Sequence, residues 1–76
     1  MTADHHELRE AYQNEAGARL ELQRFRAHRL VEWVKFNPRS AKVVAEARVA
    51  LEPKVQELED AYEEARIALE LVKADL

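Results

Sequence analysis

The stretch FNPRS, residues 36–40, decides the fold of this chain, because it joins two long segments with helical patterning. Asn37 precedes Pro38, and the residue before a proline is pushed away from helical backbone angles. Pro38 itself suits the first position of a helix, with Asn37 as its N-cap. We therefore expect one helix to end near Phe36 and a second to begin near Pro38. A link this short makes the two helices antiparallel neighbours.

The second segment, residues 44–76, carries the clearest periodic pattern. Positions at alternating spacings of four and three are apolar except for Arg48, which is typical of a coiled-coil seam. These seam positions are Val44, Arg48, Leu51, Val55, Leu58, Tyr62, Ala65, Leu69, Val72 and Leu76. Pro53 falls on the outermost helical position, where it can bend a helix without disturbing the seam. We therefore favour one second helix kinked at Pro53. The alternative is two helices, with Pro53 as the first residue of the later one.

The first segment is helical as well, with Asp4 and Glu7 spaced as a variant capping box at its start. If the chain folds back at Asn37, the numbers of facing residues sum to 76 or 77. Five apolar pairs then line up without adjustment: Leu8–Leu69, Ala11–Ala65, Ala18–Leu58, Leu22–Val55 and Phe25–Leu51.

The predicted fold is therefore all-α, an antiparallel two-helix coiled-coil hairpin in a single domain of residues 1–76. The first helix covers about residues 4–36, the turn lies at about 37–38, and the second helix covers about 38–75. At 1.5 Å for each residue, the hairpin should be ~50 Å long.

A second apolar stripe on the first helix predicts another packing partner, since one hairpin covers only one stripe. This outer stripe consists of Ala16, Leu20, Ala27, Val31 and Val34. Small residues on the second helix, Ala47, Ala61 and Ala68, allow a further helix to approach closely. A chain of 76 residues buries only ~60% of its unfolded surface, so association would add stability. We expect a homodimer that forms a four-helix bundle, or docking onto a larger helical partner.

The turn end is basic and aromatic, whereas the other end is acidic. Residues 19–48 hold eight bases and three acids, residues 1–18 have net charge −3, and residues 49–76 have net charge −5. The hairpin tip, our candidate partner-binding surface, consists of Arg29, Trp33, Phe36, Arg39, Lys42 and Arg48. Aromatic and arginine side chains dominate protein interfaces, and basic aromatic surfaces also bind nucleic acid. The net charge of −3 disfavours the nucleic-acid alternative.

Two features of the tip have structural alternatives. Arg29 and Arg48 could face each other as an anion site, or each could bind an acid, with Arg48 pairing to Glu52 and Arg29 to Glu32. Trp33 and Phe36 could cap the end of the hydrophobic core, or Trp33 could be an exposed anchor for a partner.

The remaining patterns indicate no catalysis. Adjacent His5 and His6 point about 100° apart on a helix and do not share a metal ion easily. The acids of residues 57–64 fit a solvated face rather than catalytic carboxylates. We therefore predict a non-enzymatic interaction module, an adaptor, inhibitor or assembly component, with no cofactor, metal, small-molecule substrate or membrane contact. The chain has no apolar run of ~18 residues and no secretory signal, so we expect a cytoplasmic location or membership of a larger intracellular or particle assembly.

Overall fold

The computed structural model describes residues 4–76, which form three helices and no strand. Helix α1 spans His5–Phe36, α2 spans Lys42–Ala50 and α3 spans Pro53–Ala74. The described part of the chain is all-α, as predicted. Residues 1–3 of the predicted domain lie outside the described residues.

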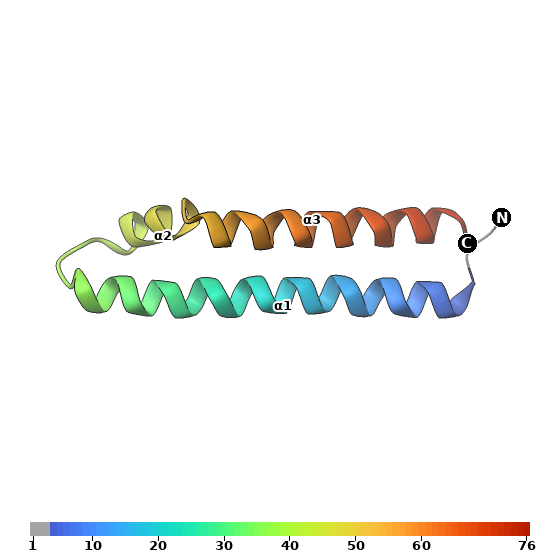
Figure 1. Ribbon diagram of the computed structural model, residues 1–76, viewed down its shortest axis with the longest axis horizontal. Helices are drawn as coiled ribbons and strands as arrows, with labels where there is room; N and C mark the ends of the chain where they lie inside the picture. Colours follow the sequence, from blue (N-terminus) through green and yellow to red (C-terminus); the bar gives the residue numbers. More distant parts are fainter. Residues whose placement is uncertain (1–3) are drawn as a thin grey trace.

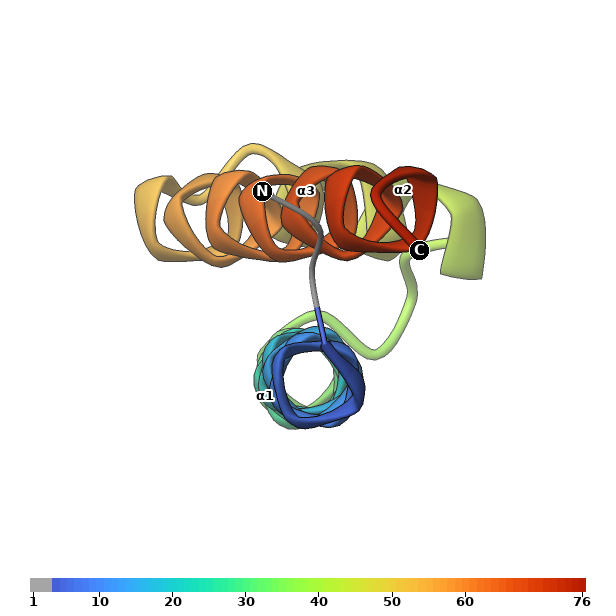
Figure 2. The ribbon, with the colours of Figure 1, turned by 90° about the vertical axis from the view of Figure 1, so that its right-hand side faces the viewer.

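The chain reverses between α1 and α2, so that α2 and α3 return along α1 (Figure 1). The start of α1 and the end of α3 lie at the same end of an elongated molecule of 55 × 16 × 15 Å. Viewed along α1, helix α3 lies obliquely across it, as packed helices do when their side-chain ridges interlock (Figure 2).

Both ends of α1 are capped by short polar side chains. The Glu7 backbone N–H donates to Asp4 Oδ1 at 2.8 Å, so the predicted N-cap at Asp4 is confirmed. At the other end the Asn37 side-chain amide donates to the Trp33 carbonyl at 2.9 Å. The helix therefore ends where the Asn-Pro pair predicts it.

The hydrophobic core lies between α1 and the returning helices. One cluster of its buried side chains consists of Leu22 of α1, Val49 of α2, and Val55 and Leu58 of α3. Four partly buried side chains pack against this cluster: Phe25, Leu30, Trp33 and Tyr62. Leu22 and Val55, a predicted pair, therefore belong to the same core.

The prediction of one continuous, kinked second helix was wrong, and the alternative with Pro53 as the first residue of a separate helix is confirmed. Helix α2 ends at Ala50, and α3 begins at Pro53. Proline has no N–H to donate to Val49, and its ring clashes with that carbonyl. Glu52, the residue before the proline, is extended, with ψ of 136°. The Val49 carbonyl instead accepts from the Glu52 N–H at 3.0 Å.

The predicted start of the second helix at Pro38 was also wrong. Pro38, Arg39 and Ser40 form a turn, which the Ser40 N–H closes by donating to the Asn37 carbonyl at 3.1 Å. The next helix begins only at Lys42, after an extended Ala41. Asn37 therefore caps the end of α1 instead of starting the following helix.

The buried face of α2 is shifted by one residue from the predicted seam. Ala45 and Val49 are buried, whereas the predicted seam residues Val44 and Leu51 are exposed, Leu51 by 68%. The predicted Phe25–Leu51 pair is therefore wrong, and Val49 lies in the core instead. The two non-helical residues between α2 and α3 break the helical phase, so the α3 seam cannot be extended into α2.

Candidate interaction surface

An ion-pair cluster joins α1 to the break between α2 and α3. Arg29 Nε donates to Glu52 Oε1 at 2.8 Å, and Arg29 Nη2 donates to the same oxygen at 2.5 Å. Arg29 Nη1 donates to Glu32 Oε2 at 2.5 Å, and Glu32 Oε1 lies 2.6 Å from His28 Nε2. The predicted Arg29–Glu32 pair is confirmed, whereas the predicted Arg48–Glu52 pair is wrong because Glu52 binds Arg29.

The ion pair between Arg29 and Glu52 shifts the pKa of both side chains. The hydrogen bond from Arg29 lowers the pKa of the Glu52 carboxyl below its usual value, although partial desolvation opposes the shift. The hydrogen bond to Glu52 likewise raises the pKa of Arg29. Both side chains are charged at neutral pH and bind each other, so the guanidinium of Arg29 is engaged within the chain.

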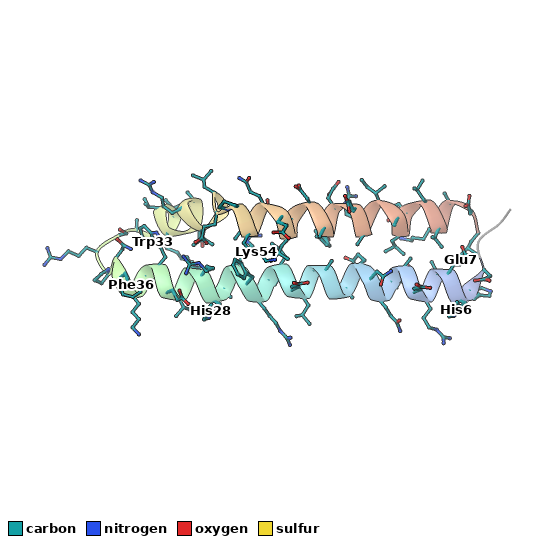
Figure 3. All side chains as sticks on the ribbon, in the orientation of Figure 1. His6, Glu7, His28, Trp33, Phe36 and Lys54 are labelled. Atoms are coloured by element: carbon teal, nitrogen blue, oxygen red, sulfur yellow. The ribbon has the colours of Figure 1, made fainter. Side chains whose placement is uncertain are left out.

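The two tip aromatics lie in different surroundings, although both are at the chain-reversal end (Figure 3). Trp33 packs against the core cluster and is partly buried. Phe36 is 78% exposed. Trp33 therefore covers the end of the core, as one of the two alternatives predicted, but that alternative was wrong for Phe36, which lies in solvent beyond the core.

The predicted tip cations Arg39, Lys42 and Arg48 are all exposed. Lys42 lies 3.8 Å from Glu46. Within residues 4–76, Arg39 and Arg48 have no carboxylate within 4.0 Å, and the same holds for Lys35 nearby. The tip therefore combines exposed aromatic surface with uncompensated positive charge.

The residues of the predicted self-association face fall on more than one surface. Leu20, Val31 and Val34 of the outer stripe are exposed, Val31 by 68%. Ala16 of this stripe is partly buried, and Ala27 is exposed. Exposed Ala61 and Ala68 instead line a hollow between α3 and the start of α1, beside Glu7, Glu10 and Asn14. Ala47 is exposed on α2.

A groove between α1 and α2 was not predicted. Two adjoining hollows share Leu30 and together form this α1–α2 groove. Its apolar lining residues are Ala27, Leu30, Val31, Val34 and Val49, and its polar ones are Arg26, Ser40, Lys42 and Glu46. Three outer-stripe residues and one tip cation therefore line these two hollows. Sequence periodicity could not reveal it, because it depends on the phase of the separate helix α2.

Residues 4–76 lack two structural features, a cluster of metal-ligating side chains and a helix that could span a membrane. No group of three or more His, Asp or Glu side chains is placed there to hold a metal ion. No helix in that range combines the length and apolar character that crossing a bilayer requires. Comparisons with protein-family models, with curated proteins and with solved structures found no match to this chain.

Proposed function

We propose that this chain is a non-catalytic protein-interaction module, a coiled-coil hairpin whose outer stripe and tip contact another protein chain. The observation that carries the proposal is the exposure of large apolar side chains along the outer stripe of α1. Leu20, Val31 and Val34 are all more than two-fifths exposed. Covering such side chains is worth about 1.5–3 kcal/mol each when burial is complete.

The proposed assembly takes one of two forms, a second copy in a four-helix bundle or a larger helical partner. In both forms an apolar helix face packs against another helix, as in bundles. A partner would also stabilise a chain too small to build a large core. This role fits an adaptor, an inhibitor or an assembly component.

The test is the solution mass of the chain by light scattering, alone and with candidate helical partners. We expect the wild type to exceed the 8.8 kDa of one copy. The double variant Leu20→Glu/Val31→Glu should lower the association constant about a hundredfold, because it places two charges in a buried contact. Gln56→Glu, a charge change at an exposed site on α3, is the control and should assemble as the wild type does. A fully helical monomer that binds no partner would refute the proposal.

A second candidate function is nucleic-acid binding through the tip, which the exposed Phe36 and the uncompensated cations favour. Binding of labelled DNA or RNA should then weaken steeply with salt. The double variant Arg39→Glu/Lys42→Glu should abolish it. Absence of a mobility shift at low salt would eliminate this function.

A further inference from the structure

We propose that the α1–α2 groove of one copy binds the outer face of α3 of a second copy, in a head-to-tail contact. The inference rests on the proposed function and names the partner and both contacting surfaces. It requires an apolar groove with a basic rim, an apolar helix face with acidic flanks, and a charge distribution that favours this pairing over others.

The groove offers an apolar lining along about two turns of α1. Its α1 side runs from Arg26 to Val34, which corresponds to ~12 Å of helix or about two turns. Its apolar lining is aliphatic, and its charged lining consists of two cations, Arg26 and Lys42, and one acid, Glu46, which lies 3.8 Å from Lys42, so the lining is net positive. An amphipathic helix binds such a groove through apolar side chains one turn apart, with acids placed toward the basic margin.

The outer face of α3 provides that pattern within the same chain. Ile67 and Leu71, one helical turn apart, are 47% and 64% exposed. Three exposed acids lie on the same side, Asp60 and Glu64 before them and Asp75 after them. Within residues 4–76, none of these three carboxylates has a cation within 4.0 Å. The α3 outer face is therefore an acidic amphipathic surface without a partner in its own chain.

The distribution of charge selects this pairing. The half of the molecule near the tip, residues 21–57, holds eight bases and five acids and has net charge +3. The opposite half, residues 4–20 and 58–76, holds four bases and ten acids and has net charge −6. Binding of α3 in the groove brings the positive half of one copy against the negative half of the next. Such complementarity favours correct pairing and excludes wrong partners.

The competing contact, outer stripe against outer stripe, lacks this complementarity. The centre of the stripe lies between Leu20 and Val31, where Arg24 and Arg26 flank it. Two copies joined antiparallel through this stripe would place four cations close together, which costs free energy. Charge therefore favours contact between two different faces over contact between two identical ones.

Contact between two different faces has a consequence for assembly. Each copy carries one groove and one α3 outer face on separate surfaces, so every bound copy still offers a free site. Such heterologous contacts produce rings or open chains instead of stopping at a two-fold dimer. The weight-average mass should therefore rise with concentration beyond that of two copies.

The test uses two complementary variants and sedimentation equilibrium. Val34→Glu places a charge in the groove and leaves the α3 outer face unchanged. Leu71→Lys places a charge on the α3 outer face and leaves the groove unchanged. We expect each variant alone to lower the association constant at least tenfold and to sediment near the monomer mass. An equimolar mixture should form a 1:1 heterodimer and stop there, because only one intact groove and one intact α3 face remain. Far-UV circular dichroism checks that both variants, changed at exposed sites, remain helical.

The outcomes separate this inference from the proposed function. Gln56→Lys adds the same charge to α3 away from Leu71 and should assemble as the wild type does. If Leu71→Lys assembles normally while Leu20→Glu/Val31→Glu does not, the groove–α3 contact is wrong and the interaction module stands. A mixture of the two complementary variants that stays monomeric also overturns the contact. A monomeric wild type that binds no added partner overturns both proposals.

Discussion

At the scale of single residues, the most informative side chain is Arg29. Its sequence position allows two arrangements, facing Arg48 as part of an anion site or pairing with Glu32. In the structure it binds Glu32 on its own helix and also Glu52, 23 positions away. Glu52 is the extended residue that precedes Pro53, so this ion pair fixes the break between α2 and α3 against α1.

We expect Glu52→Gln to lower the thermal unfolding midpoint by roughly 2–6 °C, because it weakens a charge-assisted pair that spans two elements. Glu21→Gln removes the same charge at an exposed site of α1 that has no cation within 4.0 Å in residues 4–76, and it is the control. An equal loss in both variants would show that net charge, and not the Arg29 pair, is responsible.

The stability contributed by this pair should depend on pH in the acid range. Arg29 lowers the pKa of Glu52 below its reference value of 4.5, so the folded state favours the ionised carboxyl. The contribution is therefore complete above pH 4.5 and is lost as the pH falls through the lower, folded-state pKa. Urea unfolding of the wild type and Glu52→Gln should give curves that converge as the pH is lowered. A constant difference would contradict this.

At the scale of helices, the break between α2 and α3 is the decisive feature. Both sides of it obey local rules, since proline starts α3 and the residue before proline is extended. The apolar sequence pattern nevertheless continues across Pro53 and, taken alone, predicts one continuous helix. The lost N–H and the steric clash of the proline ring decide against continuity, and α2 then buries Ala45 and Val49.

Replacing Pro53 with Ala restores the missing N–H and removes the clash. We expect α2 and α3 to join, adding the two helical residues Leu51 and Glu52, which NMR secondary chemical shifts at residues 50–53 would detect. Pro38→Ala is the matched control, because Pro38 lies in the turn and outside every helix. Residues 51–52 that stay non-helical in Pro53→Ala would show that tertiary contacts, not proline, maintain the break.

At the scale of the whole molecule, charge is separated along a body 55 Å long. The tip half is positive, and the half that holds the start of α1 and the end of α3 is negative. The apolar groove lies in the positive half, and the α3 outer face lies in the negative half. Attraction between copies should therefore depend on the ionic strength.

Raising NaCl from about 0.05 M to 0.5 M should weaken self-association several-fold, because salt screens the attraction between the groove margin and the α3 acids. Sedimentation at both concentrations measures this effect directly. Association that strengthens with salt would instead indicate a purely apolar or like-charge contact, such as one between two outer stripes.

The sequence by itself determined the helical character, the Asp4 cap, the extent of α1 and the reversal after Phe36, because these depend on hydrogen bonds between near neighbours. It also determined the buried face of α3, where an unbroken helix keeps one phase from Val55 to Leu69. Only the tertiary structure decided the phase of α2, the partner of Glu52 and the groove between α1 and α2. The two non-helical residues between α2 and α3 allow many relative orientations of these helices. Packing against Leu22, Leu30 and Trp33 selects one orientation.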